Sequence, residues 1–225
     1  MQDNTLKRSP GRPKAEHSVT DARQELIDTA AHLFGEQGYS ATSLRQVAQG
    51  AGVTPAMVAY YFKDKPGLLE AVVISGLEKM LSMVRAVVEE QPAAGSPTTD
   101  LEFLPRFIRG YLATIHANPW IPQILMREVV SRDTPLRQLF IDQFAKKAVE
   151  LVPPKVAAEI HSGRLRSDLD PRYTLLSLIG MCLFPYLAQP VLGPLLGYQF
   201  DETFRQSYTK HTLELFLEGA GGVGR

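Results

Sequence analysis

The stretch that decides the fold runs from residue 42 to residue 69 and reads TSLRQVAQGAGVTPAMVAYYFKDKPGLL. Its first half predicts a short helix, because Ser43 and Gln46 have the spacing of a capping box. A glycine-containing turn then ends that helix. Thr54 can cap the next helix, with Pro55 at its first position, where proline loses no hydrogen bond. Two short helices joined by a tight turn are therefore expected.

The segments on either side of this stretch predict two more helices. Apolar residues between positions 21 and 37 recur at the spacing of an amphipathic helix, with Asp21 as its expected cap and Gly38 just past its end. Asp64 can cap a long helix over residues 65–88. Three short helices in succession, with a tight turn between the second and third, are typical of a DNA-binding helix-turn-helix domain.

The charges of this region fit DNA. From Ser43 to Phe62 the chain carries one charged residue, Arg45, and no acid. A helix that enters the major groove cannot carry carboxylates toward the phosphates without repulsion. The alternative is a three-helix core unit with no DNA role.

The rest of the chain predicts only further helices. They are expected at residues 101–116, 120–131, 135–152, 154–162, 171–187 and 202–218. Prolines mark several boundaries, above all Pro153-Pro154, since proline disrupts a helix interior. No segment alternates convincingly as a strand. The sequence therefore predicts an all-α fold.

Three runs of this sequence resemble the TetR family of bacterial transcriptional regulators. They are AAHLFGEQGYSATSLRQVA at 30–48, AGVTPAMV at 51–58 and YYFKDKPGLL at 60–69. The segment GRLRSDLDP at 163–171 also resembles the turn before the first dimerisation helix of many members. The resemblance implies an N-terminal three-helix head that binds DNA and a larger helical body that binds a ligand and dimerises. The expected domains are a flexible basic arm at 1–20, the head at 21–66, the body at 67–218 and a flexible tail at 219–225.

The resemblance makes Thr54–Phe62 the recognition helix and implies that Val58 and Phe62 point back into the small core of the head. The short apolar side chains of this helix can touch thymine methyl groups but cannot read bases by bidentate hydrogen bonds, so part of the specificity is expected from DNA shape. Family members often carry a tyrosine where this chain has Ala59, so Tyr60 or Tyr61 is expected to contact a phosphate instead. The full set of expected DNA contacts is Arg12, Lys14, Thr42, Arg45, Thr54, Pro55, Ala56, Met57, Tyr60, Tyr61, Lys63 and Lys65.

The basic arm carries two of these contacts. Its Gly-Arg-Pro tripeptide, at residues 11–13, suits a narrow A·T minor groove, where arginine meets enhanced negative potential. A solvated tail that binds nothing is the alternative.

The body is expected to bind a small molecule between its helices. Apolar pockets with few polar groups are the usual small-molecule sites, although an aromatic stripe at helical spacing is more often plain core. The candidate lining residues are Phe107, Tyr111, Trp120, Ile124, Arg127, Phe144, Met181 and Phe184.

The helices near 171–187 and 202–218 are expected to form a homodimer. Apolar residues wrap nearly around the first of them, more than a monomer of this size hides easily. Two recognition helices would then meet the half-sites of an inverted repeat in double-stranded DNA. Most members act as repressors that an effector releases, and this is the expected role here. A DNA-binding regulator without a small ligand, acting as an activator, an architectural factor or a partner-controlled protein, is the alternative.

Composition excludes several other classes of protein. The chain has 225 residues, with 24 Lys+Arg balanced by 24 Asp+Glu, so a basic surface must be local. A single cysteine, Cys182, rules out a disulfide framework and a multi-thiolate metal site. No hydrolase, phosphate-binding or metalloprotease motif is present, so no enzyme activity, cofactor or metal is expected. A cytoplasmic location fits best.

One uncharged stretch, Tyr173 to Phe200, is long enough to test for a membrane span. Pro185, Pro190 and Pro194 interrupt it, and prolines this close would break the backbone ladder in lipid. The expectation is a buried helix that ends near 185–188, followed by an apolar loop, with no membrane contact.

Overall fold

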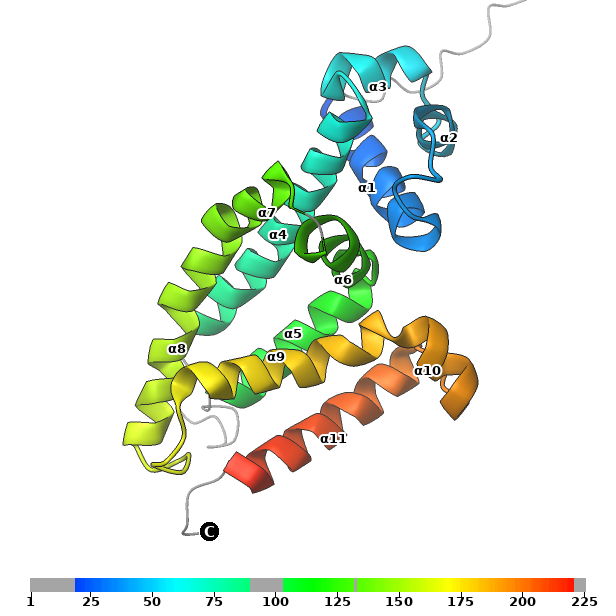
Figure 1. Cartoon of the computed structure of the whole chain (residues 1–225). Helices are drawn as coiled ribbons and strands as arrows, with labels where there is room; N and C mark the ends of the chain where they lie inside the picture. Colours follow the sequence, from blue (N-terminus) through cyan, green and yellow to red (C-terminus); the bar gives the residue numbers. More distant parts are fainter. Residues whose placement is uncertain (1–18, 90–102, 132, 221–225) are drawn as a thin grey trace, which may run out of the picture.

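The structure is a computed structural model that describes residues 19–89, 103–131 and 133–220. No β-strand occurs in these ranges, which confirms the all-α fold (Figure 1). In chain order the elements are α1 (Val19–Gln37), α2 (Leu44–Gly50), α3 (Pro55–Phe62), α4 (Lys65–Glu89), α5 (Phe103–Ala117), α6 (Trp120–Ile124), the π-helix η2 (Leu125–Val130), α7 (Pro135–Phe140), the π-helix η3 (Ile141–Ala145), α8 (Lys146–His161), α9 (Pro171–Leu187), α10 (Gln189–Leu196) and α11 (Glu202–Ala220).

Helices α1 to α3 form a head at one end of the molecule (Figure 1). The expected capping box starts α2: the Gln46 N–H donates to Ser43 Oγ at 3.2 Å, and the Ser43 N–H donates to Gln46 Oε1 at 2.7 Å. Helix α1 begins at Val19, so Asp21 lies inside the helix and is not its cap, contrary to expectation. Gly38 follows the end of α1 with φ of +88°, as a C-terminal glycine does.

Helix α4 connects the head to the body. Its first half, from Leu68 to Leu77, packs into the head core, and its second half, from Met80 onward, packs into the body core. A shift of α4 therefore changes the packing of both the head core and the body core.

One expected helix boundary in the body is wrong. The chain continues as helix α8 through Pro153 and Pro154, where a break was predicted. Val152 and Val156 on either side of the prolines are buried in the body core, and this packing outweighs the hydrogen bonds that proline removes.

Residues 189–196 form helix α10, where an apolar loop was expected. Pro190 lies in the first turn of α10, where proline is tolerated, and Gly197 ends it with φ of +70°. In the described part of the chain no single helix is long and apolar enough to cross a membrane; only the pair α9 and α10, bent by 73°, passes on length and composition together.

Helices α9 and α11 lie side by side along one edge of the body (Figure 1). The Tyr208 hydroxyl of α11 donates to the backbone oxygen of Met181 in α9 at 2.8 Å. This bond ties the two helices that were expected to form the dimer face.

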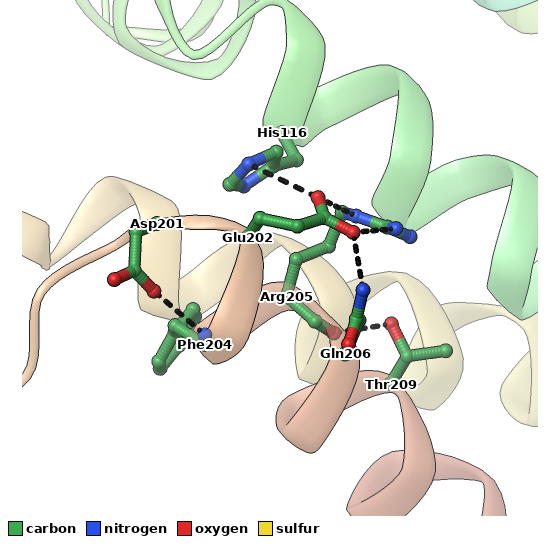
Figure 2. Close-up of polar contacts among 7 residues, drawn as sticks. All are labelled: His116, Asp201, Glu202, Phe204, Arg205, Gln206 and Thr209. Carbon is green, nitrogen blue, oxygen red and sulfur yellow. Dashed lines mark hydrogen bonds and ion pairs between the residues drawn. The ribbon is translucent and has the colours of Figure 1, made fainter.

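A polar cluster fixes the start of α11 against the end of α5 (Figure 2). Asp201 caps α11 by accepting the Phe204 N–H at 2.9 Å. Glu202 accepts from Arg205 Nε at 2.7 Å and from Gln206 Nε2 at 2.8 Å, and it lies 3.9 Å from His116 Nε2 of α5. These hydrogen bonds, first that of Arg205, lower the pKa of the Glu202 carboxyl to about 2.

Candidate DNA-binding surface and ligand cavity

Helix α3 presents the residues expected to read DNA on its outer face. Thr54, Pro55 and Ala56 are exposed, and Met57 is half-buried. On the inner face Val58 and Phe62 are buried in the head core, as expected. The outer face is therefore free to enter a groove.

The end of α3 carries two tyrosines in different settings. Tyr60 is 79 % exposed, whereas Tyr61 is half-buried, and their rings meet edge to face with centroids 5.0 Å apart. Tyr60 is the better placed of the two to reach a phosphate.

A strained turn joins α3 to α4. Lys63 adopts φ of 65° and ψ of −59°, and the Asp64 N–H donates to Phe62 O at 2.8 Å, which defines a γ-turn. Asp64 then caps α4 as expected, since its Oδ1 accepts the Gly67 N–H at 2.8 Å. A Cβ at Gly67 would lie 2.2 Å from Phe62 O, so this position requires glycine. The turn holds Lys63 in solvent beside the first turn of α4.

Lys65 is held against the link between α1 and α2. Its Nζ lies 3.4 Å from Ser40 O and 4.3 Å from the ring centroid of Tyr39. Tyr39 thus positions the ammonium group next to the start of α4, where backbone N–H groups also favour a phosphate.

One expected DNA contact is wrong. Thr42 is only 1 % exposed, and its hydroxyl donates to Gly38 O at 2.9 Å. Its side chain therefore closes the link before α2 and does not reach DNA. Arg45 on α2 is exposed, while Arg12 and Lys14 lie outside the described residues.

Sequence inspection missed one cation of this surface. Arg23 of α1 is exposed, and its guanidinium carbon lies 5.4 Å from the ring centroid of Phe62 at the end of α3. Only the packing of α1 against α3 brings it there, so no local pattern could have indicated it. Helices α2 and α3 carry no acid, and the nearest carboxylate in sequence, Asp64 between Lys63 and Lys65, caps α4.

The body holds an apolar cavity of about 190 Å³. Phe107, Tyr111 and Phe144 of the expected ligand residues line it. The wall as a whole is hydrocarbon except for sulfur and one hydroxyl, and comprises Leu77, Met80, Val84, Phe107, Tyr111, Ile115, Ile121, Pro122, Leu125, Met126, Val130, Phe140, Phe144, Ala148, Val152, Leu175, Ile179, Leu183 and Leu187. A larger hollow of about 700 Å³ between α5 and α11 is an open groove bordered by charged residues.

Trp120 and Ile124 belong to the junction with the head and not to the cavity. A Cβ on Gly35 of α1 would lie 2.6 Å from Trp120 Cβ, and one on Gly76 of α4 would lie 3.0 Å from Trp120 Cζ3. Trp120 is thus wedged between the two helices, and Ile124 is buried in the head core. Both predictions failed because periodicity shows which residues are apolar but not which core they join.

Three further candidates also lie away from the cavity. Arg127 points to the head, where its Nη1 donates to Gly35 O at 3.4 Å. Phe184 is 61 % exposed on the outer face of α9. Met181 packs beside the body core without lining the cavity, and its backbone oxygen accepts the Tyr208 hydroxyl.

The π-helix η2 touches both sites. Leu125, Met126 and Val130 line the cavity, whereas Arg127 contacts α1 and Val129 is buried in the head core. The pKa of Tyr39 is raised mainly by burial and then by the nearby charge of Glu128, which is itself buried. π-Helical turns often mark functional sites, and this one spans the distance between cavity and head.

Exposed apolar side chains gather on α9, α10 and α11. Tyr173, Leu176 and Phe184 are exposed along α9, as is Leu215 on α11. Gly180 lies among the α9 residues, and a Cβ there would meet nothing within 4 Å. Val191, Leu195 and Leu196 are also exposed on α10.

The described residues contain no group of three or more His, Cys, Asp or Glu side chains that could hold a metal ion. Cys182 is buried, and burial raises the pKa of its thiol to about 12, so it stays protonated.

A three-helix head with an exposed, acid-free second and third helix defines a helix-turn-helix DNA-binding protein. The family model described as bacterial regulatory proteins, tetR family, matches residues 26–72. A probable HTH-type transcriptional regulator, YttP of Bacillus subtilis, is 25 % identical over 185 residues, which are 81 % of this chain and 85 % of that protein.

Solved structures share the whole fold. The ketosteroid transcriptional regulator KstR2 of Mycobacterium tuberculosis has a TM-score of 0.70 at 20 % identity, covering 88 % of this chain and 94 % of its own. AibR, solved with isovaleryl coenzyme A and operator DNA, has a TM-score of 0.67 at 20 % identity, covering 87 % and 98 %. The match over residues 26–72 assigns the head to the TetR family of transcriptional regulators, and the chain shares its overall fold with these solved regulators.

Proposed function

We propose that this regulator is a dimeric repressor that binds an inverted-repeat operator and leaves it when a small apolar ligand fills the body cavity. The observation that carries this proposal is η2, a single short element that lines the cavity with one face and contacts the head with the other. An occupant of the cavity therefore presses on an element that also positions α1.

The DNA surface supports readout by shape and by apolar contact. Ala56 and Met57 would meet thymine methyl groups, and Arg45 and Lys63 would supply polar contacts. Tyr60, Tyr61 and Lys65 would fix the register on phosphates. Thr54 and Pro55 would lie at the groove edge, and Arg12 and Lys14 would reach the minor groove from the arm.

The exposed apolar face of α9 and α11 supports a two-fold dimer. Soluble monomers rarely leave such a patch uncovered, and a second copy would bury Tyr173, Leu176, Phe184 and Leu215 against the same residues. Two heads would then face successive half-sites of one operator.

Release would work by population shift. A ligand can weaken DNA binding only through its different affinities for the DNA-competent and released states. The Arg127 contact to Gly35 O and the wedge of Trp120 between α1 and α4 are the contacts that such a shift would alter.

The lining supports a ligand whose enclosed part is hydrocarbon. Ligand pockets usually measure about 300–1,000 Å³, so the cavity of about 190 Å³ takes a small molecule or one end of a larger one. The exposed rim residues Met126 and Val130 would contact whatever extends outside. AibR was solved with isovaleryl coenzyme A, a molecule that combines a small apolar end with a large polar one.

The other candidate is a DNA-binding regulator without a small ligand. The apolar cavity next to the junction with the head favours the ligand-responsive regulator over it. The effector, the operator and the cytoplasmic location remain predictions.

The test is a titration of fluorescent operator DNA with the full chain, with and without apolar molecules that raise its melting temperature. Molecules that stabilise the protein should also raise the Kd for operator. If they stabilise it and never change the Kd, the ligand-release mechanism fails and the regulator without a ligand takes its place.

A further inference from the structure

One polar group lies in the wall of the apolar cavity. Of all residues that line it, only Tyr111 has an oxygen or nitrogen in its side chain. Tyr111 comes from the middle of α5 and is 7 % exposed, with its ring 5.8 Å from that of Phe107. The lining of the cavity is therefore apolar except for the hydroxyl-bearing side chain of Tyr111.

No hydrogen bond of that hydroxyl occurs among the residues that the structure describes, and the hydroxyl is not one of the fully enclosed side-chain atoms that lack a partner there. Burial raises the pKa of Tyr111, so the group stays protonated and can donate. A hydroxyl in an apolar wall gains free energy when it finds an acceptor. Tyr208 of α11 has found one, since its hydroxyl donates to Met181 O at 2.8 Å.

The lining of the cavity contains no group that would stabilise a charged ligand. None of its lining residues is ionisable at neutral pH, and an unpaired carboxylate would lose its hydration without gaining a partner. An engineered cavity of about 150 Å³ holds benzene, so about 190 Å³ holds a six-membered ring with one further substituent.

We propose that the cavity recognises an uncharged, compact hydrocarbon frame that bears one ketone or hydroxyl oxygen, and that Tyr111 donates a hydrogen bond to this oxygen. The inference rests on the proposed ligand-binding function and names the chemistry of its ligand. Carboxylates of the same size are excluded.

A matched pair of small molecules tests the hydrogen bond. Cyclohexanone and methylenecyclohexane have nearly the same shape, but only the ketone has an acceptor. Their Kd values for the full chain are measured by ligand-observed NMR in the wild type, in Tyr111→Phe and in Tyr186→Phe. Tyr186 is the control, because its hydroxyl is buried without a partner among the described residues and Tyr186 does not line the cavity.

Loss of the Tyr111 hydroxyl should weaken cyclohexanone binding about two- to tenfold, the usual net effect of one neutral hydrogen bond. It should leave methylenecyclohexane binding unchanged, and Tyr186→Phe should affect neither molecule. Cyclohexanecarboxylate at pH 7 should not bind. Thermal melts of the variants establish that each is folded.

Each contrary result has a distinct meaning. Equal effects of Tyr111→Phe on both molecules, or binding of the carboxylate as tightly as the ketone, would overturn the inference while leaving a ligand-binding cavity. Failure of both neutral molecules to bind the folded wild type would overturn the cavity's role and this inference with it.

Discussion

At the scale of the residue, Lys65 and Tyr39 show how a phosphate contact is prepared before DNA arrives. The Tyr39 ring and the Ser40 oxygen hold the Lys65 ammonium beside the start of α4. Less side-chain entropy is lost on binding when a long side chain is already positioned. Sequence alone indicated Lys65, but its support by Tyr39 depends on the packing of the link between α1 and α2.

Lys65→Ala should weaken binding to all DNA sequences alike, because a phosphate contact carries no base information. The slope of log K against log salt should fall by about 2, because each protomer of the proposed dimer loses one phosphate contact. Fluorescence anisotropy at several salt concentrations measures both effects, with Lys155→Ala on the exposed surface of α8 as the control. An unchanged slope would show that Lys65 does not meet a phosphate.

At the scale of the element, η2 is the part of the chain on which the proposed regulation depends. Filling the cavity by Ala148→Leu should imitate an occupant and weaken operator binding. In an Arg127→Gln background the same change should have an effect about two- to tenfold smaller, because the contact that carries the strain to Gly35 is lost. Operator Kd values for the four proteins complete the cycle. Identical effects of Ala148→Leu in both backgrounds would remove Arg127 from the coupling.

The start of α11 gives a pH prediction. Because hydrogen bonds lower the pKa of Glu202 to about 2 from its ordinary 4.5, its contribution to stability is present above pH 4.5 and is lost as the pH falls toward 2. The difference in free energy of unfolding between the wild type and Glu202→Gln should therefore be constant from pH 5 to 8 and shrink below pH 4.5. Urea titrations measure it, and a difference that changes between pH 6 and 8 would point to another group.

Elements differ in how far sequence could predict them. The caps at Ser43 and Asp64 and the outer face of α3 are set by residues a few positions apart, so local patterns sufficed. The helix through Pro153 and the helix α10 depend on tertiary packing that outweighs local signals. Tertiary packing also decides which aromatic residues line the cavity. The prediction for Tyr111 is correct, whereas Trp120, which is equally aromatic, lies at the junction with the head.

At the scale of the whole molecule, the proposed dimer depends on the apolar face of α9. Gly180→Leu should leave the protomer folded, since a Cβ there meets nothing within 4 Å, but should block close approach of a second copy. Sedimentation velocity should show a weakened dimer, and operator binding should fall with it. Lys155→Leu on α8 is the control. If the wild type sediments as a monomer both without DNA and when bound to operator DNA, the proposed dimer is contradicted.

The central claim, that this protein is a dimeric sequence-specific regulator, is tested most directly by selection of genomic DNA fragments with the purified full chain at two salt concentrations. The account predicts that one inverted repeat is enriched and that the enrichment persists at the higher salt, because base contacts add to the phosphate contacts. Recovery of DNA without a shared sequence, lost at the higher salt, would show only non-specific phosphate binding and would contradict it.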